Sequence, residues 1–223
     1  MLEYKGLLDI NSPVAATFPG FAKNGKGEIT ILDVLTHRSG VLLPHLHAKF
    51  EIWNNKAEMQ QQSVDAVPLY KRGTLAYQPN EFAWILSEIV SRIDGRELAD
   101  YIEQEISIPL QLSDLKFGRS GDEYQSMAYS YWLGKDKVMV GGNNVAKNYE
   151  DWSNDPQFFN SRSPSFSLIT NAASLAAFYE VLVNGGTTAT GTRLLSEDVL
   201  KRYTKRQVFG WDNTLKSFNR LLK

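Results

Sequence analysis

Residues 80–95, NEFAWILSEIVSRIDG, give the strongest structural signal in this 223-residue chain. Their apolar side chains recur at the spacing of an amphipathic helix, and Gly95 stands where a helix commonly ends. The apolar positions are Phe82, Ile85, Leu86, Ile89, Val90 and Ile93. The stretch therefore predicts a helix with a continuous apolar face.

Four other segments predict shorter helices because each joins a capping or stop residue to an apolar period. These segments are residues 30–39 (cap Thr30, stop Gly40), 96–106 (stop Pro109), 170–184 (cap Thr170 or Asn171, stop Gly185 and Gly186) and 196–203 (cap Ser196). In residues 170–184 the predicted apolar stripe runs through Leu175, Phe178 and Leu182.

The segment between Arg119 and Pro164 is instead rich in Gly, Asn, Ser and aromatic residues. Within it, residues 128–142 predict a two-stranded hairpin that turns near Gly134–Asp136. Such an excursion either covers a site or is a surface hairpin without function, and the sequence favours neither.

Composition excludes several classes of function. With 24 Lys+Arg against 25 Asp+Glu, the formal net charge of -1 indicates neither a nucleic-acid partner nor a membrane surface. The absence of cysteine excludes disulfides, a thiol nucleophile and a thiolate metal site, and it leaves the compartment undefined. No apolar run reaches the roughly 18 residues of a membrane span, and residues 1–10 lack the pattern of a signal peptide. We expect a soluble chain without a membrane span.

Two local patterns resemble binding motifs only in part. Residues 20–27, GFAKNGKG, place Gly20, Gly25 and Lys26 as in a phosphate-binding loop, but Gly27 replaces the hydroxyl residue and no strand precedes the loop. A simple turn is the favoured interpretation. His45 and His47, with Glu51 nearby, supply too few imidazoles for a metal site, so we predict polar loop histidines and neither metal nor cofactor.

A third pattern, Ser113 to Lys116, is the chain's only Ser-x-x-Lys. On a buried helix, a lysine three positions after a serine can accept the hydroxyl proton if desolvation keeps its amine neutral. The residues that follow, FGRSGDEYQ, cannot continue an apolar helical stripe. Lys116 should therefore stay hydrated and protonated, which makes the spacing a coincidence.

Five segments occur in the order in which the serine beta-lactamase-related family carries similar ones. They are GLLDINSPVAATFPGF (6–21), ITILDVLTHRSGV (29–41), YQPNEFAWILSEIVSRIDG (77–95), ISIPLQLSDLKFG (106–118) and ITNAASLAAFYEVLVNGG (169–186). The chain thus resembles a family of class C beta-lactamases, D-alanyl-D-alanine carboxypeptidases and related esterases. The resemblance implies an α+β fold, in which a helical domain packs beside an antiparallel sheet flanked by helices. It also implies an acyl-enzyme mechanism on an ester, amide or lactam, without a cofactor.

Residue roles follow from the resemblance at two positions. The family's tyrosine motif falls on YQPN, which assigns to Tyr77 the transfer of a proton between nucleophile and leaving group. The family often has asparagine two residues after that tyrosine, where this chain has Pro79, so the substrate-contact role moves to Asn80. Without the resemblance, Tyr77 would be taken as a packed aromatic residue ahead of a helix.

The resemblance also implies that parts of the domain lie outside residues 1–223. Ser113 falls in a family segment without a catalytic part, the family's Ser-x-x-Lys helix would begin before Met1, and its Lys-Thr-Gly or His-x-Gly strand would follow residues 209–218. We therefore expect an incomplete, mainly helical beta-lactamase-related domain that is inactive by itself and exposes an apolar face through which it associates. The alternative is a noncatalytic binding or scaffold module with the same fold.

Overall fold

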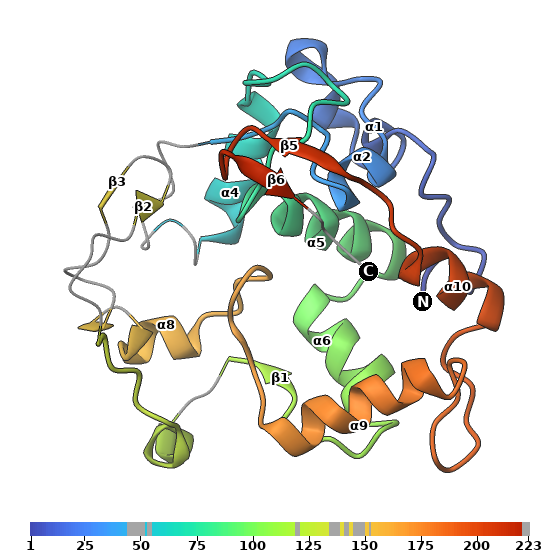
Figure 1. The fold of residues 1–223 in the computed structure, drawn as a ribbon, viewed down its shortest axis with the longest axis vertical. Helices are drawn as coiled ribbons and strands as arrows, with labels where there is room; N and C mark the ends of the chain where they lie inside the picture. Colours follow the sequence, from blue (N-terminus) through green and yellow to red (C-terminus); the bar gives the residue numbers. More distant parts are fainter. Residues whose placement is uncertain are drawn as a thin grey trace.

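A helical body surrounds α5 (Glu81–Asp94) in the structure, a computed structural model (Figure 1). It describes residues 1–43, 52, 55–118, 121–133, 139–140, 143–144, 150–151 and 153–219. The other helices are α1 (Val14–Thr17), α2 (Ile31–Leu35), α4 (Lys56–Asp65), α6 (Leu98–Ile102), α8 (Pro156–Asn160), α9 (Ala172–Val183) and α10 (Glu197–Thr204). Short segments of other helix types span Pro19–Gly25 and Gly121–Ser126 (3-10 helix) and Glu103–Ser107 (π-helix).

The core forms where α5 contacts α1, α2, α4 and α6. Ile85 and Ile89 of α5 are fully buried there, together with Val14, Phe21 and Val34 from the preceding elements. Burying an isoleucine side chain stabilises the fold by about 1.5–3 kcal/mol, so this face of α5 is a main source of stability. Gly95 ends the helix with φ of 87°, as predicted.

The predicted helices form, with differences at their ends. Thr30 caps α2 in a capping box with Asp33, but the helix ends at Leu35 because His37 adopts a left-handed φ of 54°. Asn171 caps α9 and Ser196 caps α10. The segment after residue 96 forms α6 and a π-type turn over Glu103–Ser107 before Pro109.

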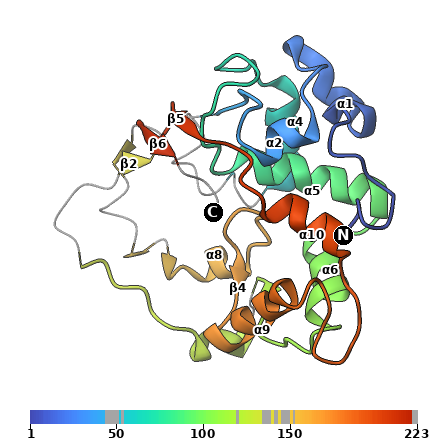
Figure 2. The same cartoon turned by 45° about the vertical axis from the view of Figure 1, so that its right-hand side comes forward.

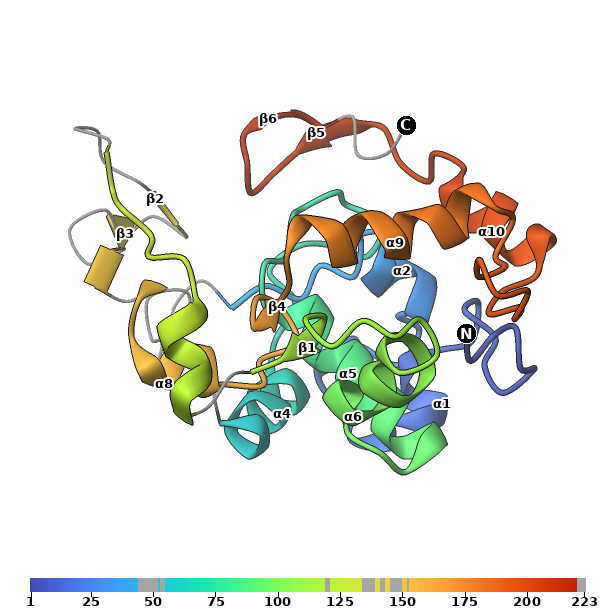
Figure 3. The ribbon, with the colours of Figure 1, turned by 90° about the horizontal axis from the view of Figure 1, so that it is seen from below.

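The predicted stripe of α9 is only partly correct. Leu175 is 40% exposed, whereas Ser174 and Val181 are buried. Apolar residues occur on all sides of this helix, so the face that is buried depends on where neighbouring elements lie and not on the period. Figure 3 shows α9 and α10 on the same side of α5, away from α4.

Helix α4 had no predicted counterpart because its sequence, KAEMQQQSVD, is polar and carries no apolar period. Only Met59 and Ser63 of this helix are buried. Asn55 caps it by accepting a hydrogen bond from the Glu58 N–H at 3.0 Å.

The strands form three two-stranded antiparallel ladders among the described residues. β1 (Lys116–Phe117) pairs with β4 (Leu168–Ile169), β2 (Met139–Val140) with β3 (Asn143–Asn144), and β5 (Gly210–Asp212) with β6 (Ser217–Asn219). Figure 2 shows β5 and β6, in red, as a separate ladder near the C-terminal end of the chain. An α+β fold with a helical majority is confirmed.

The predicted hairpin of residues 128–142 is wrong in its pairing. Residues 128–133 form no strand, and Val140 pairs instead with Asn143. Gly141 and Gly142, which stand between these two in the sequence, lie outside the described residues. The predicted turn at Gly134–Asp136 lies outside the described residues.

Candidate active site

The turn that precedes α5 carries Tyr77, and contacts from distant segments fix its backbone. The Ala76 N–H donates to the His37 carbonyl oxygen at 3.0 Å. The Tyr77 N–H donates to Asp212 Oδ1 at 3.2 Å, and the Gln78 N–H donates to His37 Nδ1 at 3.3 Å. Three successive amides are thus held by His37 and Asp212, which makes this turn a rigid support for the Tyr77 side chain.

The loop of residues 36–41 has a backbone shape that makes these contacts possible. Gly40 has φ of 76°, and a Cβ atom there would lie 2.0 Å from the Tyr70 carbonyl oxygen. The N–H groups of Leu69 and Tyr70 both donate to the Gly40 carbonyl oxygen, at 2.9 and 3.2 Å. Glycine is therefore required where the two backbones meet.

Ser39 joins this loop to the residue after Tyr77. Its hydroxyl and the Gln78 side-chain amide exchange hydrogen bonds of 2.8 and 3.1 Å, and both side chains have no exposed surface. Two segments that carry the family resemblance, residues 29–41 and 77–95, are therefore in direct contact.

The Tyr77 ring lies half-buried against His37. The two ring centroids are 5.0 Å apart at an interplanar angle of 63°, and His37 makes a similar edge-on contact with Phe82 at 4.8 Å. Edge-to-face contacts of this kind add to the stabilisation from burial. They fix where the Tyr77 phenol leaves the turn.

Two carboxylates and burial govern the electrostatics of the site. Asp212 has no exposed surface and also accepts the N–H groups of Thr214 and Leu215, at 2.8 and 2.9 Å. Burial, and then the negative charges of Asp212 and Glu81, raise the pKa of Tyr77 above 10.0. At neutral pH the phenol is therefore protonated, so it can donate a proton but is poorly suited to accept one.

Asn80 follows at the start of α5, where its backbone carbonyl accepts the Ser165 hydroxyl at 3.3 Å. The side chain is only 3% exposed and does not cap the helix. Its Nδ2 has no hydrogen-bond partner among the described residues. A buried amide donor without a partner costs about 1–3 kcal/mol, so this amide is a candidate ligand contact.

Ser113 and Lys116 are arranged as expected if their Ser-x-x-Lys spacing is a coincidence. Ser113 is exposed in a turn, and Lys116 lies in β1, so the pair does not share a helical face. The Lys116 ammonium lies 2.5 Å from a Glu123 carboxylate oxygen. The Lys116 amine is therefore engaged in an ion pair with Glu123, which is not the arrangement that a base for Ser113 requires.

The glycine-rich stretch at residues 20–27 is a turn only at its end: residues 20–25 belong to the 3-10 helix Pro19–Gly25, which kinks at Lys23 and Asn24. The Lys26 side chain is fully buried, and its ammonium donates to the Val64 and Ala66 carbonyl oxygens at 2.9 and 2.5 Å, closing the end of α4. His45, His47 and Glu51 lie outside the described residues. Within the described ranges, no three His, Asp or Glu side chains gather as a metal site.

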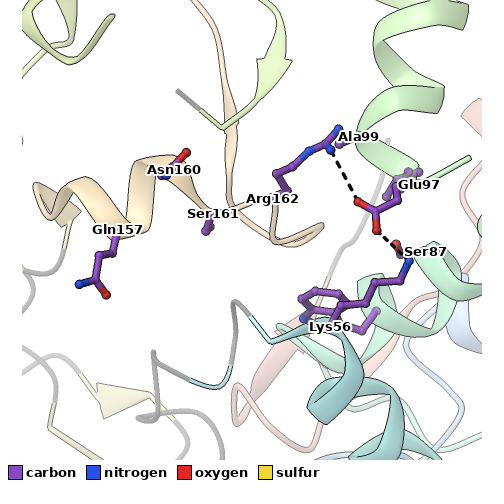
Figure 4. A pocket seen from close by; sticks show the side chains of 10 residues that line it. Lys56, Ser87, Glu97, Ala99, Gln157, Asn160, Ser161 and Arg162 are labelled. Carbon is purple, nitrogen blue, oxygen red and sulfur yellow. Dashed lines mark hydrogen bonds and ion pairs between the residues drawn. The ribbon is translucent and has the colours of Figure 1, made fainter. Parts of the chain in front are cut away.

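A polar pocket of about 450 Å³ lies away from Tyr77, between α4, α6 and the segment that follows α8. Figure 4 shows Glu97 between two cations, with Lys56 at 3.0 Å and Arg162 at 3.6 Å. Arg162 also pairs with Asp100. The charges compensate one another within the protein, so this pocket favours neither an anion nor a cation.

Comparison with known proteins identifies the family of this chain. The model of the family described as Beta-lactamase matches residues 1–220. The chain belongs to the beta-lactamase family. It is 24% identical to the esterase/beta-lactamase LipL of Mycobacterium tuberculosis over 98% of this chain and 55% of that protein. It is 26% identical to the N-acetylmuramyl-L-alanine amidase of Bacillus subtilis over 83% of this chain and 46% of that one. The chain thus spans about half the length of these relatives.

Solved structures of the beta-lactamase family share this fold. A family VIII carboxylesterase superposes with a TM-score of 0.84 at 22% identity, covering 97% of this chain and 60% of that one. The predicted beta-lactamase/transpeptidase-like architecture is confirmed. In the part of the chain that the structure describes, no helix has both the length and the apolarity to cross a bilayer.

His37, Ser39, Gln78 and Asp212 were not among the predicted site residues. His37 and Ser39 lie in LTHRSG and Gln78 in YQPN, so the resemblance had marked their segments without indicating a role. Asp212 has no local signal. It reaches Tyr77 only because β5 folds back over a separation of 135 residues.

Proposed function

We propose that this chain forms the tyrosine-bearing part of a serine hydrolase that acts on an ester, amide or lactam through an acyl-enzyme. Membership of the beta-lactamase family over residues 1–220 is the observation that carries the proposal. In this reaction a serine hydroxyl adds to the carbonyl carbon and its proton moves to the leaving group. As the bond between the carbonyl carbon and the leaving group breaks, Tyr77 is proposed to relay the proton: the phenol gives its own proton to the leaving group and takes up the serine proton in its place.

The surroundings of Tyr77 support its role as a donor. Its phenol is protonated at neutral pH because burial and two carboxylates raise its pKa. A phenol becomes a good base only when cations stabilise the phenolate. Asn80, whose buried Nδ2 has no partner among the described residues, is proposed to donate a hydrogen bond to the substrate.

We propose further that residues 1–223 alone do not turn over such substrates. Ser113 lies in an exposed turn, and Lys116 is ion-paired with Glu123. The direct test is intact-mass spectrometry after incubation with a fluorophosphonate and, separately, with a penicillin. We expect no adduct. An adduct on Ser113 would refute this proposal and identify a relocated nucleophile.

The hydrolase proposal is tested by the coding sequence upstream of Met1. If it encodes an in-frame Ser-x-x-Lys ahead of an apolar helix, a chain with that extension should hydrolyse an activated ester. Tyr77→Phe should then lower kcat by about 100-fold or more, the usual contribution of a general acid or base. An authentic start at Met1 without that motif would favour the noncatalytic binding module.

Self-association through α9 completes the proposal. Leu175, Tyr179 and Val183 of this helix are 40%, 55% and 85% exposed. Contiguous apolar side chains on a surface favour contact with another such surface. We expect concentration-dependent association in analytical ultracentrifugation, weakened by Val183→Lys. A monomer that melts cooperatively and binds no hydrophobic dye would refute this part.

A further inference from the structure

His37 contacts Tyr77 and the residues on both sides of it. Its carbonyl oxygen accepts the Ala76 N–H at 3.0 Å, and its Nδ1 accepts the Gln78 N–H at 3.3 Å. Its ring packs edge-on against the Tyr77 ring, with centroids 5.0 Å apart. A single residue thus restrains the backbone before Tyr77, the backbone after it and the aromatic side chain itself.

We propose that His37 is a positioning residue that sets the place of the Tyr77 phenol, and that it acts as a neutral imidazole with Nδ1 unprotonated. A neutral imidazole has one donor and one acceptor nitrogen, so acceptance at Nδ1 puts the proton on Nε2. The catalytic meaning of the proposal rests on the proposed function of Tyr77. The positioning of the turn by His37 does not depend on that proposed function.

The local fold holds the imidazole in this orientation. His37 follows α2 with φ of 54°, and its N–H donates to the Val34 carbonyl oxygen at 3.1 Å. Phe82 of α5 packs on the ring from another side at 4.8 Å. Nδ1 therefore faces the Gln78 N–H without freedom to turn away.

A phenylalanine could make both ring contacts but has no acceptor for Gln78. Histidine is thus specified by the hydrogen bond and not by the packing. Protonation would also remove that bond, because an imidazolium carries N–H groups on both nitrogens. The site is consequently sensitive to the charge state of His37.

The charged and titratable groups around His37 come from β5, from α5, from the Tyr77 turn and from its own loop. Asp212 of β5 and Glu81 of α5 favour the imidazolium, and burial opposes it more strongly, so the pKa of His37 lies below 6.5. Tyr77 lies against the ring, and the neighbouring Arg38 donates through Nε to the Thr36 hydroxyl at 3.1 Å. At neutral pH these surroundings keep the imidazole uncharged.

Amide hydrogen exchange of Gln78, followed by NMR, tests the hydrogen bond. His37→Phe keeps the ring and loses the acceptor, and we expect Gln78 to exchange about fivefold to tenfold faster, corresponding to the loss of one hydrogen bond. His37→Asn should restore slow exchange, because its Oδ1 replaces Nδ1 and asparagine tolerates positive φ. Unchanged exchange in His37→Phe would overturn the proposal.

A pH titration of the Tyr77 ring signals tests the positioning, with the signals assigned by comparison with Tyr77→Phe. In the unaltered chain we expect an inflection below pH 6.5 that is absent from both His37 variants. Ring signals without this inflection would also overturn the proposal. Neither measurement requires turnover. If both succeed while an extended chain with its Ser-x-x-Lys stays inactive, the proposed function fails and the positioning role stands.

Discussion

The turns that carry Tyr77 and Ser113 differ in how far along the chain the partners of their residues lie. The amides of Tyr77 and Gln78 are bonded to residues 135 and 41 positions away. Ser113 is exposed, and Lys116 pairs with Glu123, only 7 positions away. A favourable spacing arises by chance in any chain, whereas an environment built from distant segments requires the whole fold.

Gly40→Ala should have the largest effect on the Tyr77 turn. A Cβ atom there would lie 2.0 Å from the Tyr70 carbonyl oxygen, and φ is 76°. The left-handed backbone alone costs an alanine about 1–2 kcal/mol, and the overlap should bring the loss to about 3 kcal/mol or more. Denaturant unfolding followed by tryptophan fluorescence measures it.

Gly73→Ala is the matched control for Gly40→Ala. Gly73 has φ of 93°, but nothing lies within 4 Å of the position of its Cβ. It should lose only the backbone contribution of about 1–2 kcal/mol. Equal losses in the two variants would mean that the contact between Gly40 and Tyr70 does not limit the turn.

Asp212→Ala tests the other support of Tyr77. It would leave three partly buried N–H groups without their carboxylate acceptor, at a cost of about 2–3 kcal/mol. Removing this negative charge should also lower the pKa of Tyr77, which the carboxylate raises. Unfolding curves and an NMR titration of the tyrosine rings measure the two effects.

Asp114→Ala provides the comparison in the Ser113 turn. Asp114 is exposed there, and its Oδ2 accepts the Asn171 side-chain amide at 2.9 Å. Its loss should change the free energy of unfolding by about 0.5 kcal/mol or less. A loss as large as that of Asp212→Ala would remove the contrast between the two turns.

The sequence predicted what local physics determines. The apolar period of α5 and the caps Thr30, Asn171 and Ser196 are written in adjacent residues, and all form as expected. The polar helix α4 carries no apolar period and is held by tertiary contacts, so local reasoning missed it. The pairing of β2 with β3 is local, and the prediction placed the first strand and the turn at the wrong residues. The predicted buried face of α9 was only partly correct, because tertiary contacts decide which of its apolar side chains are buried.

The candidate site, like the fold, contains residues that the sequence indicated and residues that only tertiary contacts bring together. The resemblance directed attention to Tyr77 and Asn80, and residue chemistry dismissed Ser113 and Lys26 as catalytic or phosphate-binding residues. Asp212 could not be found from its own neighbourhood, because its role exists only once β5 reaches Leu75: the Asn213 N–H donates to the Leu75 carbonyl oxygen at 3.0 Å.

The hydrogen bond from Gln78 to His37 should make the stability of the Tyr77 turn depend on pH. We expect it to change the free energy of unfolding by about 1 kcal/mol, the value of one hydrogen bond. The pKa of His37 is about 6.5 in the unfolded chain and lower in the folded one. As pH falls, the unfolded chain therefore takes up this proton first. His37 contributes full stability above pH 6.5, and the contribution is lost as pH falls toward the folded pKa.

Unfolding at pH 5 and pH 8 measures this contribution. His37→Asn should lose less stability between the two values than the unaltered chain, because asparagine does not titrate. Other groups that titrate in both chains cancel in the difference. Parallel losses would show that His37 is not the group that couples this turn to pH.

Ser113→Ala combined with Lys116→Met tests the candidate pair itself and should have little effect on stability. Ser113 is exposed, and the Lys116 side chain keeps 31% of its surface in solvent beside Glu123. Ion pairs of this kind contribute about 0.2–1 kcal/mol, so the double variant should unfold within about 1 kcal/mol of the parent. Neither the parent nor the double variant should be labelled by a fluorophosphonate. Labelling of the parent that the double variant loses would reverse the comparison, because Ser113 would then be the reactive serine.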